Sequence, residues 1–230
     1  MVTSDAATAP VLGTVTSRPS LRDEAIRTLQ AAIVAGELRP GIVYSAPTLA
    51  AQLGMSATPV REAMLDMVKE GLVAAVRNKG FRVVELTDAE LDELTELRLL
   101  VEVPSVGRVA ARGLSTAERT PLRKLALESE RAARKGDLIT HNRADLEFHT
   151  GLLAVLGNRA LVDLVRTLRT RSRLYGQAEL AASGSLAPSS HEHLELLALV
   201  DAGDKRGAEK LMRQHIGHVR GSWASGVADR

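Results

Sequence analysis

Three histidines and one aspartate are spaced so that they can meet at one point. Asp145 and His149 are four residues apart, so on a helix both side chains leave the same face. His193 lies ten residues before Gly203, and His215 lies twelve residues after it. At ~1.5 Å per residue, these positions are ~15 and ~18 Å along two antiparallel helices, so the imidazoles can face each other. Three imidazoles and one carboxylate suit a divalent transition metal such as zinc, nickel or manganese.

A surface ion pair is the alternative interpretation of this pattern, because an aspartate four residues before a histidine is common on helices. Other histidines also compete for the same face. His141 is four residues before Asp145, and His218 is three residues after His215, so either can share the stripe. Spacing alone therefore leaves both interpretations open.

Helices must position these residues, and the chain after residue 86 has a helical pattern throughout. Thr87 with Glu90 and Ser115 with Glu118 are capping-box pairs, each of which begins a helix. Pro104 lies inside the first of these helices and is expected to kink it. The apolar stripe of that helix is predicted to consist of Leu91, Leu94, Leu97 and Val101.

Glycine-containing breaks divide the rest of this region into further helices. A loop rich in Ser, Gly and Pro is predicted over 183–190. The predicted helices cover 87–112, 115–135, 137–156, 160–180, a stretch that ends near 203, and 204–223. The sequence thus predicts an antiparallel all-α bundle of about six helices.

The stretch over 45–84 predicts a helix, a tight turn, a second helix and a hairpin, and an amphipathic helix over 21–35 precedes it. Gly54 can end the first of the two helices, and Ser56 or Thr58 can cap the second. Gly71 suits a Schellman ending, with Leu72 folding back onto the helix. Two β-prone runs then flank the turn residues 77–80.

A helix that begins in small polar residues and Arg61 has the arrangement that a recognition helix needs. The N-terminal end of such a helix faces base edges and phosphates in the major groove. Arg77, Lys79 and Arg82 place positive charge at or near the hairpin tip, as a basic wing would. The alternative is a three-helix scaffold with an ordinary solvated hairpin.

The words L-A-x-x-L-G-x-S-x-T-P-V-R-E-A and E-G-L-V, with K-G-F after them, resemble the winged-helix domain of the GntR family of bacterial transcription regulators. The resemblance covers about 21–84. Ala57 stands where the family usually has arginine, and losing a bidentate guanine contact would remove roughly 1–3 kcal/mol of discrimination. The operator is therefore expected to differ from the usual family consensus or to be recognised less stringently. The resemblance implies DNA contacts at Ser56, Thr58, Arg61, Lys79 and Gly80.

Residues 86–220 resemble the effector-binding (FCD) domain of the FadR-type branch of this family. The matching words are L-R-x-x-V-E at 97–102, D-x-x-F-H at 145–149, H-E-H at 191–193 and Q-H-I at 214–216. A small carboxylate, such as a hydroxy acid or sugar acid, could complete the coordination sphere of the ion, with Arg98 as a clamp. The alternative for Arg98 is an ion pair with Glu102, four residues on. The resemblance implies metal ligation by Asp145, His149, His193 and His215.

Composition sets limits on these hypotheses. The 230 residues include 45% apolar but only 2% aromatic residues, which is typical of a helical core, and no cysteine for a disulfide or thiolate site. No run is long enough to span a membrane and no secretory signal is evident, so a cytoplasmic protein is expected. The net charge is +2, so DNA binding must rely on placed charges rather than on a large field.

The sequence therefore predicts a mainly α protein that is a homodimeric, ligand-responsive repressor of transcription and not an enzyme. It would bind a pseudo-palindromic operator in double-stranded DNA. A metal-dependent hydrolase or lyase is the alternative, although no G-x-S-x-G motif is present; an architectural DNA binder is another. The predicted parts are a disordered arm at 1–19, a winged helix-turn-helix at 20–85, and an all-α effector-binding and dimerisation domain at 86–225.

Overall fold

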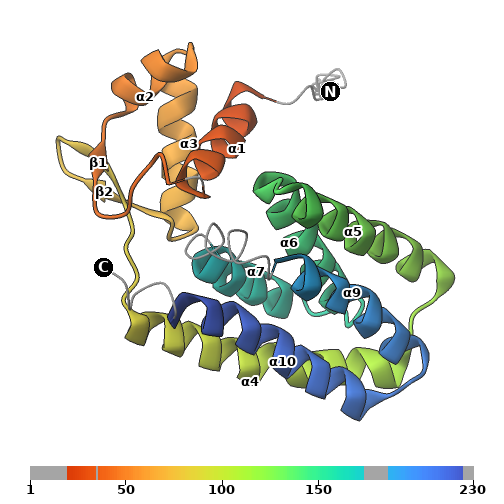
Figure 1. Cartoon of the computed structure of the whole chain (residues 1–230). Helices are drawn as coiled ribbons and strands as arrows, with labels where there is room; N and C mark the ends of the chain where they lie inside the picture. The colour runs from red at the N-terminus through yellow and green to blue at the C-terminus, as the bar shows by residue number, and fades with distance from the viewer. Residues whose placement is uncertain (1–19, 35, 174–185, 225–230) are drawn as a thin grey trace, which may run out of the picture.

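The computed structural model describes residues 20–34, 36–173 and 186–224, which form two packed groups of elements (Figure 1). We call them the head (residues 21–83) and the bundle (residues 88–224). The head contains α1 (Leu21–Val34), β1 (Val43–Tyr44), α2 (Ala46–Leu53), α3 (Ala57–Lys69), β2 (Val73–Val76) and β3 (Gly80–Val83). The bundle contains α4 (Asp88–Arg112), α5 (Thr116–Lys135), α6 (Leu138–Ala154), α7 (Arg159–Arg173), α9 (Leu186–Asp201) and α10 (Lys205–Ala224).

Local signals in the sequence account for the helix-turn-helix of the head. The Ser45 side chain accepts a hydrogen bond from the Thr48 N–H at 3.2 Å and begins α2. Gly54, in the left-handed conformation at φ 63°, ends it. α3 ends in the predicted Schellman motif, in which the Leu72 N–H donates to the Met67 carbonyl at 2.9 Å. Local signals thus fix both ends of α2 and the C-terminal end of α3.

A three-stranded antiparallel sheet in the order β1-β3-β2 completes the head. The β2–β3 hairpin is confirmed, and Val76 pairs with Gly80 across its turn. β1 was not predicted, because two residues are too short to display an alternating pattern. Tyr44 of β1 pairs with Phe81 of β3, so the strand before α2 anchors the wing to the helix-turn-helix.

The backbone conformation at position 80, at the tip of the wing, requires a glycine. Its φ is 134°, and a Cβ there would collide with the Tyr44 carbonyl. Gly80→Ala is therefore expected to destabilise the head by about 1–3 kcal/mol, measured by chemical denaturation. The exposed neighbour provides the control, since Lys79→Ala should leave stability nearly unchanged. Equal stability of Gly80→Ala and the wild type would contradict this account of the wing.

The bundle is held by long helices packed side by side. α4 runs unbroken through Pro104 and lies against α10, while α5 packs on both α6 and α9 (Figure 1). Both predicted capping boxes are present, at Thr87 with Glu90 and at Ser115 with Glu118. Six helices are described in this region, as predicted, and its core consists of Phe148 with aliphatic side chains such as Leu152. None of the described helices is long and apolar enough to cross a membrane.

Two predictions about the bundle are wrong. The predicted buried stripe fails at Leu97, which is 46% exposed. Arg98 and Glu102 take the inward positions that follow Leu94, because they form a buried ion pair. Residues 186–190 begin α9 rather than belonging to a loop, since Pro188 lies in the first turn, where its missing N–H costs no helical bond. The predicted arm at 1–19 and the end of the fourth predicted helix lie outside the described residues.

Candidate metal centre and nucleic-acid interface

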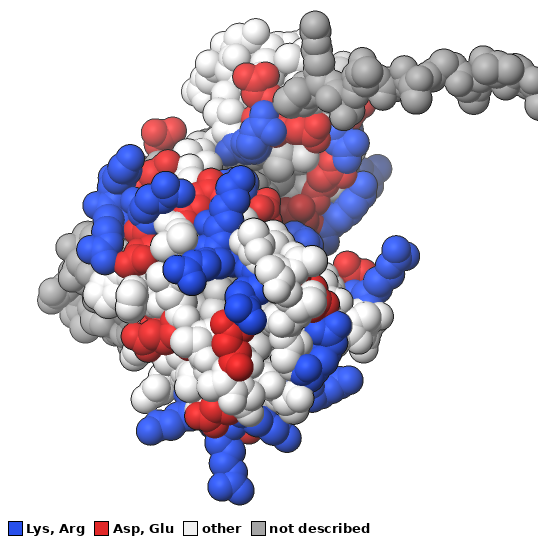
Figure 2. All heavy atoms as spheres, turned by 90° about the vertical axis from the view of Figure 1, so that its right-hand side faces the viewer, with Lys and Arg blue, Asp and Glu red and all other residues white. Residues whose placement is uncertain are grey.

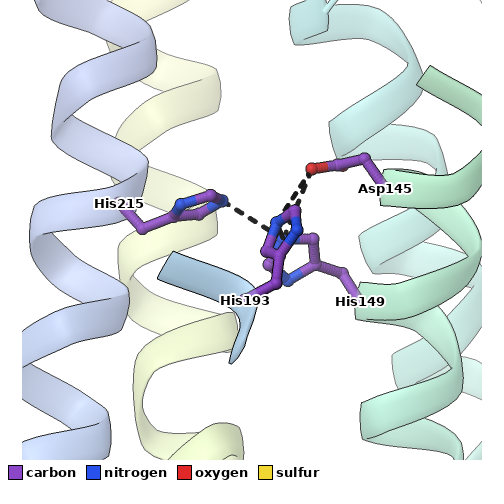
Figure 3. A group of neighbouring side chains, drawn as sticks. All are labelled: Asp145, His149, His193 and His215. Atoms are coloured by element: carbon purple, nitrogen blue, oxygen red, sulfur yellow. Dashed lines mark hydrogen bonds and ion pairs between the residues drawn. The ribbon is translucent and has the colours of Figure 1, made fainter. Parts of the chain in front are cut away.

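Asp145, His149, His193 and His215 meet in the interior of the bundle (Figure 3). α6 supplies the aspartate and the first histidine, and α9 and α10 supply one histidine each. One ligand atom from each of the four side chains lies within 4.8 Å of all the others, and all four residues are buried. The turn at Gly203 thus brings His193 and His215 to one height, as their distances from it predicted.

The separations between these donor atoms fit a single metal ion. His149 Nε2 lies 3.0 Å from His193 Nε2 and 3.2 Å from His215 Nε2, and His193 Nε2 lies 3.1 Å from Asp145 Oδ1. Two ligands that each bind one ion at 2.0–2.1 Å are about 2.8–3.0 Å apart at octahedral angles and about 3.3–3.4 Å apart at tetrahedral angles. His149 Nε2 and Asp145 Oδ1 are somewhat farther apart, at 3.7 Å. The set is therefore arranged as ligands of one ion would be.

Protonation also suits this role. Burial lowers the pKa of His149 well below its ordinary value, and the positive charge of Arg169 adds to the effect, while Asp145 opposes it. The imidazole is consequently neutral near pH 7 and has a lone pair to offer. A metal ligand must be in this form, because a protonated imidazole cannot coordinate.

A carboxylate outside the cluster orients one of the histidines. Glu192 Oε2 lies 2.7 Å from His215 Nδ1, which places the proton on that nitrogen and leaves Nε2 to face the cluster. The other oxygen of Glu192 lies 3.1 Å from His218 Nδ1, so His218 stands outside the cluster. His141 is also outside it, since its Nδ1 lies 3.0 Å from the Ser129 hydroxyl.

A buried network of charges continues from the cluster. Arg169, fully buried on α7, donates from Nη1 to Asp145 Oδ2 at 3.4 Å and from Nε to Glu102 Oε2 at 2.8 Å. Glu102 also accepts from Arg98 Nε at 2.7 Å. This chain of contacts links α4, α7 and α6. The sequence did not reveal the part played by Arg169, because its partners are 24 and 67 residues away.

Arg98, the predicted effector clamp, makes the predicted alternative contact with Glu102. Only 1% of Arg98 is exposed, and its Nη1 lies 3.5 Å from the Ser172 hydroxyl. Its Nη2 is buried and has no hydrogen-bond partner among the described residues. A buried donor without a partner costs free energy, so one hydrogen-bonding position of this guanidinium remains available to a ligand.

Glu102 is the residue on which this network depends. Burial acts to raise the pKa of Glu102, but the positive charges of Arg169 and Arg98 outweigh it and hold that pKa below its ordinary value. Glu102→Gln is expected to destabilise the chain by about 3–5 kcal/mol at pH 7, because it leaves buried Arg98 without a counter-charge and buried Arg169 with Asp145 alone.

The pH dependence of that loss follows from the sign of the shift. A carboxylate whose folded pKa is lowered contributes stability above its unfolded value, and the contribution is lost as pH falls through the folded pKa. The difference between wild type and Glu102→Gln should therefore shrink below about pH 4.5. Urea denaturation measures it, with Glu96→Gln on the exposed face of α4 as control. A difference that stays constant down to the acid transition would contradict the ionised state of Glu102.

The predicted DNA-contact residues lie on the exposed side of the head. Arg61 is exposed on α3 and lines a groove between that helix and the wing, together with Lys79, Gly80 and Arg77. Thr58 is exposed one turn earlier on α3. Ser56 occupies the N-cap position but makes no side-chain capping bond, so its hydroxyl is not used by the helix. The structure thus gathers the recognition helix and the wing tip around one groove.

Glu147 was the candidate general base for an enzyme that used the same four residues. Glu147 lies on α6 near the metal cluster in sequence, yet it is exposed and pairs with Arg143 at 3.0 Å. It therefore does not face the cluster as a general base would. Basic and acidic side chains are interspersed on the face drawn in Figure 2, in keeping with a net charge of only +2.

Comparisons with known proteins agree with this architecture. Residues 21–83 match the bacterial regulatory proteins of the gntR family, and residues 93–218 match the FCD domain. The Nta operon transcriptional regulator of Aminobacter aminovorans is 32% identical over 169 residues, which cover 73% of this chain and 77% of that protein. The HTH-type transcriptional repressor GlaR of Escherichia coli is 29% identical, with 83% and 90% covered.

Among solved structures, McbR/YncC of Escherichia coli is similar with a TM-score of 0.68 and 27% identity, over 87% of this chain and 97% of that one. The FCD match alone covers more than half of the 230 residues. The relatives are regulators of transcription rather than enzymes. The chain therefore belongs to the gntR family of DNA-binding transcriptional regulators, in the FadR-type branch whose members carry an FCD domain.

Proposed function

We propose that this regulator is a homodimeric repressor whose operator affinity is set by a small carboxylate bound beside a metal ion in the bundle. One observation carries the proposal: four buried donor atoms lie within 4.8 Å of one another and adjoin buried Arg169, which Glu102 links to buried Arg98, in a chain whose head presents a basic groove. The similarity to a protein named as a repressor supports repression. A protein that binds an operator would act in the cytoplasm, where the DNA of a bacterium lies.

The metal ion would be held by Asp145, His149, His193 and His215. Zinc, nickel and manganese all accept such a set, and an octahedral ion would have positions left for a ligand. When bound, the ion would supply a Lewis acid that attracts a carboxylate oxygen. The choice among the three metals is left to measurement.

The charges around this site favour an anionic effector. Arg98 and Arg169 balance Glu102 and Asp145, so these four buried groups sum to zero. A divalent ion raises the sum to +2, which a carboxylate ligand would partly neutralise. Arg98 Nη2, without a partner among the described residues, provides a donor for such a ligand through a charge-assisted hydrogen bond.

Dimer formation is supported by the exposed side of α4. Leu97 and Leu100 are 46% and 64% exposed, and exposed Pro104 continues the same stripe. These positions follow a spacing of three and four residues, so they form one apolar face that a second copy of this chain could cover. Two symmetric heads would then contact two half-sites, as a pseudo-palindromic operator requires.

A titration of operator binding tests the effector role. The upstream DNA of the gene itself serves as the operator probe, and hydroxy acids and sugar acids are added to metal-loaded and chelator-treated protein. We expect at least one acid to weaken operator binding by roughly 5- to 150-fold in the metal-loaded protein only. The matched variant Arg98→Gln should lose most of that response and keep its affinity for free operator. An unchanged operator affinity with every acid at about 10 mM would contradict the effector role.

A further inference from the structure

A second cavity, distinct from the metal cluster, lies between the head and the bundle. Its volume is about 240 Å³. α1 and the end of α3 form one wall, and α6 and α7 form the other; these elements face each other in Figure 1. The head side is lined by Arg27, Gln30, Ala31, Glu70 and Leu72, and the bundle side by Ile139, Asn142, Arg143, Leu146, Glu147, Arg166, Arg169 and Thr170.

Arg169 separates this cavity from the metal cluster. It lines the cavity, yet its guanidinium nitrogens donate to Asp145 and Glu102 on the bundle interior. None of the four cluster residues lines the cavity. A ligand here would therefore touch the arginine that positions a cluster residue without reaching the cluster itself.

The charged lining favours an anion. Arg143 is neutralised by its ion pair with Glu147, and Arg169 is neutralised by the buried carboxylates. Arg143 also pairs with Glu128 outside the cavity. The lining residues that remain outside these ion pairs are positive Arg27 and Arg166 and negative Glu70, so this part of the lining carries one positive charge in excess. Burial raises the pKa of Glu70 above its ordinary value, and Asp66 adds to this, while Arg166 offsets part of it. A raised pKa means that the cavity wall favours the charged form of Glu70 less than water does.

The uncharged residues of the lining favour a ligand with two further properties, an apolar part and a hydrogen-bond donor. Ala31, Leu72, Ile139 and Leu146 give the cavity an apolar side, and Ile139 is 51% exposed. Asn142 also lines the cavity, and within the described part of the chain its buried Oδ1 has no hydrogen-bond partner. A buried acceptor without a partner is costly, so a ligand with an O–H or N–H group would gain by supplying one.

We propose that this cavity binds a small amphipathic carboxylate with one hydrogen-bond donor, independently of the metal. The carboxylate would pair with Arg166 and Arg27, the donor would bond to Asn142 Oδ1, and a short aliphatic chain would lie against Leu72 and Leu146. The volume accommodates about ten non-hydrogen atoms.

Such a ligand would hold the head on the bundle. The walls of the cavity come from both. Next to it, the turn at Gly71 that follows α3 packs closely against α7, since a Cβ built on Gly71 would lie 3.2 Å from Arg171 Cδ. The consequence for operator affinity rests on the proposed function, but binding in the cavity does not. Binding is therefore measured directly, without DNA.

The probe is 2-hydroxy-4-methylpentanoate, titrated into the full chain by calorimetry after the metal has been removed with a chelator. Two analogues separate the contributions: 4-methylpentanoate lacks the donor, and 4-methylpentane-1,2-diol lacks the carboxylate. We expect the hydroxy acid to bind about tenfold more tightly than the acid without the donor, and the diol to bind more weakly than both.

Variants locate the site. Arg166→Gln and Asn142→Leu should each lower the affinity for the hydroxy acid about tenfold. Ala31→Phe should abolish binding, because the larger side chain would fill the cavity. Arg108→Gln, exposed on α4, is the control for a lost surface charge. The affinity of His149→Ala for the probe should be within about twofold of the wild-type affinity.

Two results would overturn the proposal. Binding that requires the metal, or that His149→Ala removes while Ala31→Phe leaves it intact, would place the probe at the cluster. The absence of binding by all three compounds at about 10 mM would also overturn it. Binding at the cluster would agree with the carboxylate site of the proposed function, and the absence of binding would leave operator binding and metal ligation untested by this experiment, so the proposed function would survive both results.

Discussion

Arg61→Ala is expected to weaken operator binding by roughly 30-fold to 10⁴-fold. One arginine contact to a base pair provides about 1–3 kcal/mol of discrimination, and a dimer makes the contact twice. Arg61 is exposed on the recognition helix and lines the groove beside the wing, so its removal should leave the fold intact. Fluorescence anisotropy with labelled upstream DNA at fixed salt measures the change.

The matched control is Arg108→Ala, which removes an exposed arginine from the bundle instead. This variant should change operator affinity by less than about twofold, since Arg108 is far from the groove residues in the sequence and is not predicted to contact DNA. Unchanged affinity in Arg61→Ala, with a normal unfolding curve, would show that DNA does not bind along this helix.

A divalent metal is expected to raise the free energy of unfolding of the metal-free chain by about 2.7 kcal/mol when the free ion is at 100 times its dissociation constant. The reason is that the folded chain holds four donors within 4.8 Å, whereas the unfolded chain does not hold them together. His193→Ala should lose nearly all of this gain. Thermal and urea unfolding with zinc, nickel and manganese measure it.

His141→Ala is the matched control for that experiment. His141 is also a buried histidine of the bundle, but it bonds to Ser129 and not to the cluster. The variant should lose stability of its own and still respond to metal as the wild type does. An equal metal response in His193→Ala would mean that the ion binds elsewhere.

Much of the cluster of Asp145, His149, His193 and His215 could be predicted because it consists of two pairs, each of which is set by local geometry. Asp145 and His149 share one helix face, and a single turn at Gly203 sets the heights of His193 and His215. Resemblance to a known family then separated these histidines from His141, which spacing could not do. The contact of Glu192 with His215 is harder to predict, because the sequence shows only that Glu192 is next to His193.

Other parts depend on tertiary contacts and could not be predicted. Arg169 reaches Asp145 and Glu102 only because α7 packs between α4 and α6. Leu97 was assigned to the core because apolar periodicity favours it, but the buried pair of Arg98 with Glu102 takes the inward position. The spacing of apolar residues predicts which apolar side chains are buried, but it does not predict that a pair of opposite charges is buried instead.

The same network suggests how the bundle could influence the head. α4 begins directly after the wing, and Glu102 and Arg98 connect it to the arginine that bonds Asp145. A ligand can shift operator binding only if it binds more tightly to one arrangement of the heads than to another. The effector titration and the cavity probe measure that difference at two separate places.

Metal stoichiometry tests the central claim most directly. The purified chain is loaded in turn with zinc, nickel and manganese, dialysed, and weighed intact by native mass spectrometry beside His149→Ala and His141→Ala. We predict one ion per chain in the wild type and in His141→Ala, and none in His149→Ala. A wild type that retains none of the three metals, or a His149→Ala variant that retains one ion per chain, would contradict the claim that these four side chains hold a metal.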